Sequence, residues 1–199
     1  MSAQDHRPGE LPGPDGLVRC PWPGLERHQD YRDYHDLEWG RPVHGERALL
    51  ERLCLEAFQS GLAWLTILRK RPAFRAAFAG FDPEVVAEFG TGQVEALMDE
   101  PAIVRNRRKI EATVTNARAT LALRDRGGLD ALVWSAQPAV HRRPATAADV
   151  VASTPGSVVL ARQLKDRGFA HLGPTTVYAA MQACGVVDDH LAGCHRADA

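Results

Sequence analysis

The stretch LKDRGFAHLGPTTVYAAMQ, residues 164–182, holds two apolar helical segments joined by a turn of only a few residues. Gly168 is placed to end the first helix, and Gly173 and Pro174 to begin the second, because glycine often terminates helices and proline is favoured in a first turn. Such a turn exposes backbone N–H groups at a helix N-terminus, where a phosphate oxygen can approach closely. The stretch therefore predicts either a helix-hairpin-helix motif that contacts a DNA backbone or a plain tight turn between two helices.

Helical patterns continue through most of the chain, and clear alternating strand patterns are absent. The segment 45–60 carries its apolar residues on one arc at helical spacing. Further helices are expected over 72–81 (opened by Pro72), 82–90 (capped by Asp82), 91–100, 106–127, 157–168 and 175–185. We predict an all-α protein of many short helices, without an internal repeat or a long linker.

The composition is that of an ordinary soluble domain. Of 199 residues, 45% are hydrophobic and 25% are charged. No apolar run approaches the roughly 18 residues that a membrane helix needs, so no membrane partner is expected. The net charge of −1 and the pI of about 6.7 argue against non-specific nucleic-acid binding through bulk charge. Basic clusters at 69–71, 105–109 and 141–143 predict either a local basic face or a solvated surface.

The first 16 residues, MSAQDHRPGELPGPDG, contain proline, glycine and charge but no apolar core. They predict a flexible tail rather than a secretory signal. A helical domain is expected over residues 17–196, with 197–199 as the C-terminal end. The expected location is the cytoplasm, and the expected oligomeric state is a monomer.

Four residues near the ends of the predicted domain suggest a metal site: Cys20, His35, His190 and Cys194. In a helix, His190 and Cys194 would share one face, because they are four positions apart. Two cysteines and two histidines can close a tetrahedral zinc site, which would tie the N-terminal segment to the C-terminal one. Other possible donors are present, so spacing alone does not select this set: His28, His44, Cys54, His141, His171, Cys184 and His195.

The stretch DYRDYHDLEWGRP, residues 30–42, gathers two of the three tyrosines and one of the four tryptophans of the chain beside a histidine and several carboxylates. Tyr31, Tyr34 and Trp39 predict a small aromatic core, a pocket wall, or both at once. In the helix over 45–60, Glu56 borders the apolar arc rather than the polar face. The alternative to a role in a binding site is that Glu56 is an ordinary surface glutamate near a helix end.

Four motifs occur in a specific order: CPW at 20–22, YRDYHDLEWGRPV at 31–43, LCLEAFQSGLAWLTILRKR at 53–71 and FAHLGPTTVYAAMQACGVVDDHLAGC at 169–194. Together they resemble the 3-methyladenine DNA glycosylase I family, almost without gaps from about Cys20 to Cys194. The spacing from Cys20 to His35 looks slightly longer than in the family, which suggests a small insertion around 23–28. The resemblance implies a helix-hairpin-helix glycosylase fold and one structural zinc per chain, held by Cys20, His35, His190 and Cys194.

The activity implied by the resemblance is that of a monofunctional enzyme of base excision repair. Such an enzyme flips 3-methyladenine out of double-stranded alkylated DNA and releases it by hydrolysis as the free base. Methylation at N3 makes adenine cationic, so aromatic faces and a carboxylate suit the base. The base pocket of the family maps onto Glu56, Tyr31, Tyr34 and Trp64, with Trp22 and Trp39 close by. Expected DNA contacts come from Gln59, Gly61 and Leu62, which enter the gap left by the base, and from Lys165 and Gly173 at the hairpin.

Asp188 leaves one alternative open. Many helix-hairpin-helix glycosylases carry a catalytic aspartate in a VDxH-like run shortly after the hairpin, and VVDDHLAG at 186–193 resembles that run. Asp188 fits that position, or else Asp188 or Asp189 is an N-cap of a following helix. Two rival functions therefore remain: a broader alkyl-base glycosylase that uses Asp188, and a non-catalytic, zinc-stabilised helical domain that binds DNA.

Overall fold

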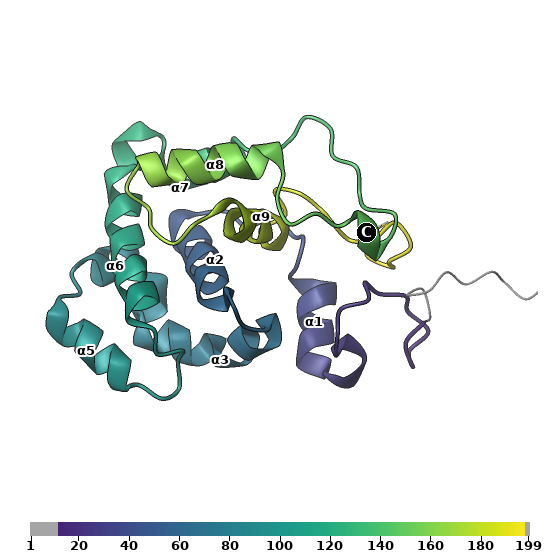
Figure 1. The fold of residues 1–199 in the computed structure, drawn as a ribbon, viewed down its shortest axis with the longest axis horizontal. Coiled ribbons are helices and arrows are strands. Elements are labelled where there is room, and N and C mark those ends of the chain that lie inside the picture. Colours follow the sequence, from purple (N-terminus) through teal and green to yellow (C-terminus); the bar gives the residue numbers. More distant parts are fainter. Residues whose placement is uncertain (1–11, 198–199) are drawn as a thin grey trace, which may run out of the picture.

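The computed structural model describes residues 12–197, which contain nine α-helices and four short 3-10 helices (Figure 1). The α-helices are α1 (Gln29–Leu37), α2 (Glu46–Gln59), α3 (Trp64–Ala77), α4 (Pro83–Ala87), α5 (Thr91–Asp99), α6 (Arg107–Ala122), α7 (Gly128–Trp134), α8 (Pro155–Asp166) and α9 (Pro174–Ala183). The 3-10 helices are Leu25–Arg27, Ala79–Phe81, Arg124–Arg126 and Ala147–Asp149. The predicted all-α class is confirmed. Of the tail expected over 1–16, residues 1–11 lie outside the described residues, as do 198–199 at the other end.

Helix α2 forms the centre of the fold, where it contacts α3, α6, α7 and α9 (Figure 1). Its residues 49–58 are all buried except the partly exposed Arg52, and Leu50, Leu55 and Phe58 have no exposed surface. A helix that is covered on nearly all sides belongs to the core of a protein. This position explains why even Glu51 and Glu56 of α2 are buried.

Helix α3 corrects one expected boundary. The sequence predicted a helix that begins at Pro72, but α3 begins at Trp64 and runs through Pro72. A proline inside a helix gives up one backbone hydrogen bond. Burial compensates for this loss, because Phe74, just past the proline, packs its ring 4.5 Å from that of Phe58 on α2. Elsewhere the predicted signals hold: Asp82 caps α4 by accepting a hydrogen bond from the backbone N–H of Glu84.

The hairpin between α8 and α9 forms as the sequence predicted. Gly168 follows α8 with φ of 89°, a left-handed conformation that favours glycine, and Pro174 opens α9. The turn is held from α6 by the buried Asn116, whose Oδ1 accepts a hydrogen bond from the N–H of Ala170 at 2.7 Å. Its Nδ2 donates to the carbonyl oxygen of the same residue at 3.2 Å. The hairpin is therefore fastened to the core at its tip.

The segment 190–194 does not form the helix that the spacing of His190 and Cys194 allowed, and it consists of turns and irregular backbone. Several backbone N–H groups here bond to distant residues, and the Cys194 N–H bonds locally to the carbonyl oxygen of Leu191 at 2.8 Å. Leu191 donates to the Sγ of Cys20 at 3.4 Å, Ala192 to the carbonyl of Pro144 at 3.0 Å, and His195 to the carbonyl of Val18 at 2.8 Å. The N- and C-terminal segments thus lie side by side. With no helix following, Asp188 and Asp189 are not helix caps.

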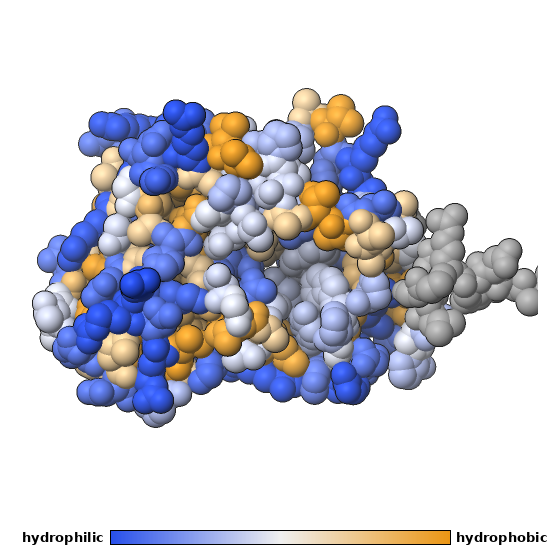
Figure 2. All heavy atoms as spheres, viewed as in Figure 1, coloured by the Kyte–Doolittle hydropathy of each residue, from blue (hydrophilic) through white to orange (hydrophobic). Residues whose placement is uncertain are grey.

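None of the described helices is long and apolar enough to cross a membrane. Hydrophilic residues cover much of the face seen in Figure 2, which is hollowed between α1 and the group formed by α2, α3 and α9. This hollow leads to the candidate active site.

Candidate active site

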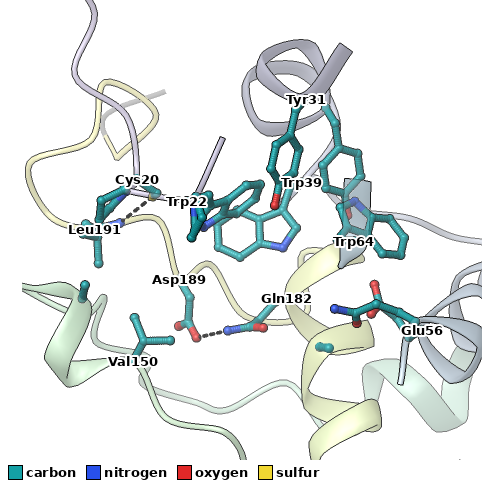
Figure 3. A pocket seen from close by; sticks show the side chains of 16 residues that line it. Cys20, Trp22, Tyr31, Trp39, Glu56, Trp64, Val150, Gln182, Asp189 and Leu191 are labelled. Carbon is teal, nitrogen blue, oxygen red and sulfur yellow. Dashed lines mark hydrogen bonds between the residues drawn. The ribbon is translucent and has the colours of Figure 1, made fainter. Parts of the chain in front are cut away.

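A cavity of about 380 Å³ lies between α1, α2, α9 and the two terminal segments (Figure 3). Its lining contains every aromatic residue expected in the pocket: Trp22, Tyr31, Tyr34, Trp39 and Trp64. Glu56 and Gln59 of α2 line it too, together with Gln182, Asp189 and Leu191. The sequence-predicted pocket residues are thus brought together in one place.

The aromatic rings form a continuous wall on one side of this cavity. Tyr31 and Tyr34 are three positions apart on α1, so they present their rings on one face of the helix. The Trp22 ring lies 5.4 Å from that of Tyr31 and 4.7 Å, edge-on, from that of Trp39. The Tyr34 ring lies 5.2 Å from that of Trp64. Most of these rings are also buried within the hydrophobic core, so the cluster serves as core and as pocket wall together.

Glu56 is the buried acid of the pocket, with only 5% of its surface exposed. No hydrogen bond or ion pair to its carboxyl group comes from residues 12–197. Burial raises the pKa of Glu56 to about 8, although the positive charge of Arg52 opposes this rise. Arg52 itself is paired with Glu38 at 3.1 Å. The surface-glutamate interpretation is therefore wrong, and the carboxyl group carries a proton for much of the time at neutral pH.

Three buried donors beside Glu56 lack a hydrogen-bond partner within the described part of the chain: the Oη of Tyr34, the Nε1 of Trp64 and the Nη1 of Arg52. Buried polar atoms are nearly always paired in folded proteins, so an unpaired group needs an explanation. Tyr34 and Trp64 line the cavity, where a ligand with acceptor atoms can satisfy them.

A groove of about 520 Å³ adjoins the pocket, since Glu56, Gln59 and Ala179 line both. The groove runs between the turn at Gln59–Leu62 and the start of α9, at Thr175 and Thr176. Gly61 turns the chain with φ of 85°, and the Leu62 side chain is 41% exposed. Lys165 and Gly173 are exposed on the nearby hairpin, but they do not line the groove. A Cβ added at Gly173 would meet no atom within 4 Å.

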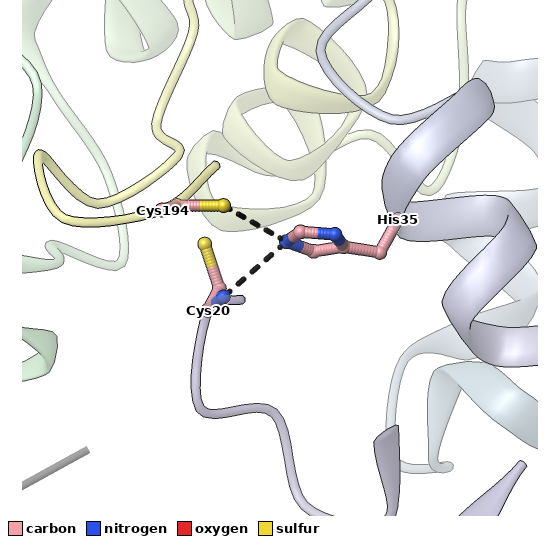
Figure 4. A group of neighbouring side chains, drawn as sticks. All are labelled: Cys20, His35 and Cys194. Carbon is pink, nitrogen blue, oxygen red and sulfur yellow. Dashed lines mark hydrogen bonds between the residues drawn. The ribbon is translucent and has the colours of Figure 1, made fainter. Parts of the chain in front are cut away.

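A second group of side chains joins the two ends of the described chain (Figure 4). Cys20, His35 and Cys194 are all buried, and their potential ligand atoms lie within 4.8 Å of one another. The hydrogen bond between the two thiols raises the pKa of Cys20 and lowers that of Cys194 to about 4. Thiolate and imidazole groups in this arrangement form a candidate metal site.

His190, the fourth expected ligand, lies beside this cluster. Its ring nitrogens are not among the potential ligand atoms that lie within 4.8 Å of one another. Its ring lies 4.9 Å from that of His35, and its Nε2 faces the carbonyl oxygen of His35 at 3.4 Å. A carboxylate fixes the other nitrogen of each histidine. Asp36 lies 2.7 Å from the Nδ1 of His35, and Asp188 lies 2.7 Å from the Nδ1 of His190.

Each of these carboxylates is in turn held by an arginine. Arg19 donates two hydrogen bonds to Asp36 from Nε, each at 3.0 Å, and Arg143 donates to Asp188 from Nε at 3.2 Å. Burial would raise the pKa of both acids, but these hydrogen bonds and those from the histidines hold it well below the usual range. Asp188 is therefore committed to His190 and Arg143, and it does not line the pocket.

Two polar pocket residues, Gln182 and Asp189, escaped the sequence analysis. Gln182 lies in the helix expected over 175–185 without a role of its own, and Asp189 was considered only as a helix cap. One signal was present: Gln182 lies four positions after Tyr178 in a helix that is otherwise apolar after Thr176, so both polar groups share one face.

Comparisons with known proteins agree with this geometry. Residues 24–197 match the family described as methyladenine glycosylase. The chain is 42% identical over 181 residues to the DNA-3-methyladenine glycosylase of Haemophilus influenzae, covering 89% of this chain and 96% of that protein. It is 42% identical over 183 residues to DNA-3-methyladenine glycosylase 1 of Escherichia coli, with the same coverage of 89% and 96%.

Solved structures show the same relationship. A crystal structure of 3-methyladenine DNA glycosylase I superposes with a TM-score of 0.85 at 42% identity, covering 89% of this chain and 98% of that one. The Staphylococcus aureus 3-methyladenine DNA glycosylase I, studied for its recognition of 3-methyladenine, gives 0.81 at 35% identity, with 85% and 92% covered. The fold and these similarities define a DNA glycosylase. The chain belongs to the methyladenine glycosylase family, which confirms the resemblance seen in its motifs.

Proposed function

We propose that this protein excises 3-methyladenine from alkylated double-stranded DNA by hydrolysis, as a monofunctional glycosylase. The observation that carries the proposal is Glu56, a buried carboxyl group without a hydrogen-bond partner among residues 12–197, facing an aromatic pocket. A buried charge is unfavourable without a partner. A cationic base supplies that partner, and its amino group supplies hydrogen bonds to the carboxylate.

Aromatic stacking provides the second part of base recognition. A positively charged, methylated adenine stacks on Trp64 and on the tyrosine rings by cation–π attraction. Stacking contributes on the order of 1–3 kcal/mol per base. The Oη of Tyr34 and the Nε1 of Trp64, which have no partner in the described part of the chain, are donors that suit the ring nitrogens of the base. An uncharged, unmethylated adenine lacks the charge that Glu56 balances, so it binds less well.

The chemical step needs little assistance, because methylation weakens the glycosidic bond. Water attacks C1′ of the deoxyribose and loses a proton to solvent, while the bond from C1′ to N9 breaks. The departing base keeps the electron pair of that bond, which neutralises its positive charge. The products are free 3-methyladenine and an abasic site. Glu56 contributes by holding the flipped base, and no covalent enzyme intermediate is needed.

The groove beside the pocket provides a path for DNA. Gln59, Gly61 and Leu62 enter the space that the flipped base leaves, and the exposed Leu62 side chain can pack there against neighbouring bases. The backbone N–H groups at the start of α9 bind a phosphate, with Gly173 allowing a close approach and Lys165 adding charge. The continuity of pocket and groove at Glu56 supports this arrangement.

We also propose one structural zinc ion per chain, bound by Cys20, His35, Cys194 and the adjoining His190. The donor set of two thiols and two imidazoles suits zinc, and carboxylates backing both histidines are common around zinc ligands. Four protein ligands leave no position for a catalytic water. The zinc therefore contributes stability by joining the chain ends, and it takes no part in hydrolysis.

Chromatography of the bases released from methylated duplex DNA tests the proposed activity. We expect the purified monomer to release 3-methyladenine and to leave 7-methylguanine in the DNA. A Glu56→Gln variant should release much less. Failure of the metal-loaded, folded protein to release 3-methyladenine would favour a non-catalytic DNA-binding domain. Release of 7-methylguanine at a similar rate would favour the broader glycosylase.

A further inference from the structure

Asp189 is a buried carboxylate on the wall of the pocket, opposite the aromatic rings (Figure 3). Only 5% of its surface is exposed. It accepts hydrogen bonds from the Oη of Tyr178 at 2.6 Å and from the Nε2 of Gln182 at 2.7 Å. The Nε2 of His141, from the segment before α8, lies 2.8 Å from its other oxygen. Two groups of α9 and one group from the segment before α8 thus hold this carboxylate in one orientation.

This arrangement fixes which end of the Gln182 amide faces the pocket. An ionised carboxylate only accepts hydrogen bonds, so the amide must turn its NH2 group towards Asp189. Its Oε1 then points away from Asp189. No side chain or backbone group within residues 12–197 donates a hydrogen bond to that oxygen. In Figure 3, Gln182 lies between Asp189 and Glu56. The amide oxygen of Gln182 and the carboxyl group of Glu56 are therefore two acceptor groups on the same side of the pocket.

We propose that Gln182 determines specificity, because its Oε1 accepts a hydrogen bond from the exocyclic amino group of the bound purine, and that Asp189 is the positioning residue that keeps the amide in this orientation. The proposal rests on the proposed function, in which Glu56 and the aromatic rings hold the methylated base. It adds the expectation that a purine with an amino group at C6 binds more tightly than one with a carbonyl group there.

The discrimination follows from hydrogen-bonding chemistry. An amino group at C6 donates to the Oε1 of Gln182, whereas a carbonyl oxygen at C6 would face another acceptor. A site built to bond a polar substrate group strongly rejects an analogue that leaves its own groups unpaired. A freely rotating amide could turn over and donate to the carbonyl. Asp189 prevents that turn, because the amide oxygen would then face a carboxylate.

Binding of two free bases tests the proposal. One is 3-methyladenine, and the other is 3-methylhypoxanthine, in which a carbonyl replaces the amino group. Quenching of tryptophan fluorescence reports their affinities, since Trp22, Trp39 and Trp64 line the pocket. We expect the wild-type protein to prefer 3-methyladenine by at least about tenfold, as one buried hydrogen bond gained or lost implies.

Gln182→Met keeps the length of the side chain but removes its amide, so the preference should fall by about tenfold. Asp189→Asn leaves Gln182 in place but lets the amide turn over, so the preference should fall as well. Gln163→Met, the same substitution on α8 outside the pocket lining, should keep the wild-type ratio. The ratio of the two affinities is the quantity to compare between variants, because a loss of stability alone lowers the affinities for both bases together.

A wild-type ratio retained in folded Gln182→Met would overturn the proposal and leave the proposed function intact. Binding of neither base by the wild-type protein would overturn both. If Asp189→Asn unfolds, as thermal melting would reveal, Gln182→Met still decides the role of the amide oxygen. A wild-type ratio in a folded Asp189→Asn variant would remove Asp189 as the positioning residue.

Discussion

The Nε2 of His35 lies 3.7 Å from the Sγ of Cys194, although the two residues are 159 positions apart in the sequence. The backbone N–H of Cys20 reaches the same nitrogen at 3.4 Å. One imidazole of α1 is therefore the meeting point of both terminal segments (Figure 4). A metal ion bound at this point closes a loop that contains nearly the whole described chain, and such a closure stabilises the folded state.

Replacing one expected zinc ligand should therefore destabilise the protein more than replacing another buried cysteine. We predict that Cys20→Ala lowers the melting temperature more than Cys54→Ala, and that it alone removes the single zinc. Cys54 is a matched control, because it is also buried and free but lies on α2. Differential scanning calorimetry and elemental analysis provide the measurements. Absence of metal from wild-type protein purified without a chelator would contradict the prediction.

Asp36 should influence metal binding without contacting the metal. Its carboxylate holds the Nδ1 of His35 at 2.7 Å, which leaves Nε2 free to bind. Loss of such a partner typically lowers metal affinity by about 10–100-fold. We predict a decrease of this size for Asp36→Asn, measured by competition with a zinc-binding dye. Asp33→Asn, at an exposed position of the same helix, is the control. Equal zinc affinities in the two variants would show that Asp36 does not influence metal binding.

Burial of Glu56 should make stability depend on pH. Its pKa is raised from an ordinary 4.5 to about 8, so between these values the folded protein holds a proton that the unfolded chain has released. The free energy of unfolding must therefore fall as the pH rises through this window. Each pKa unit corresponds to about 1.4 kcal/mol, which makes the total loss on the order of several kcal/mol.

The neutral variant Glu56→Gln should escape this loss. Urea unfolding at pH 5 and at pH 9 should show the variant gaining stability relative to the wild type at the higher pH. Glu88→Gln, a substitution at an exposed position, should track the wild type at both values. If Glu56→Gln lost as much stability as the wild type between these pH values, burial of Glu56 would not be the source of the dependence.

The elements that the sequence predicts well are those with local signals. Gly168 and Pro174 define the hairpin within a few positions, and the apolar arc of α2 places Glu56 at its buried border. Hydrogen bonds between distant residues account for the failures. The segment 190–194 has helical spacing of its possible metal donors, but the N–H groups of Leu191, Ala192 and His195 bond to Cys20, Pro144 and Val18. A local pattern contains no information about such partners.

Prediction of the site from the sequence is limited by the same dependence on distant residues. The pocket aromatics and three of the four expected metal-ligand residues come together as the motifs implied, while His190 only adjoins the metal cluster. Gln182 could not be identified, because its orientation depends on Asp189, and that of Asp189 on His141 in a third segment. Pro72 illustrates the related case in which core packing carries a helix through a residue that normally ends or opens one.

The hairpin prediction has a clean test at Gly173. Its backbone is extended, with φ of −76° and ψ of 168°, and a Cβ there would meet nothing within 4 Å. Gly173→Val should therefore fold and keep its zinc, while its side chain blocks the approach of a phosphate. One hydrogen bond to a charged group is worth roughly 1.5–3 kcal/mol, so DNA affinity should fall by about tenfold or more in fluorescence anisotropy. Gly92→Val, at an equally open position on α5, is the control, and equal affinities in the two variants would contradict the assignment.

The last prediction ranks the two acids that the sequence left open. Glu56 faces the pocket with a carboxyl group that has no partner among residues 12–197, whereas Asp188 is bonded to His190 and Arg143 outside the pocket. Glu56→Gln should slow excision of 3-methyladenine by about one to two orders of magnitude, because a hydrogen bond to a charged group is worth roughly 1.5–3 kcal/mol. Asp188→Asn should change the single-turnover excision rate by much less, once zinc content and melting temperature are matched, since it acts on the metal site. The reverse ranking in folded, zinc-loaded variants would show that a carboxylate next to His190 stabilises the positive charge of the departing sugar. In that case, the intrinsic lability of the methylated base would not suffice to explain catalysis.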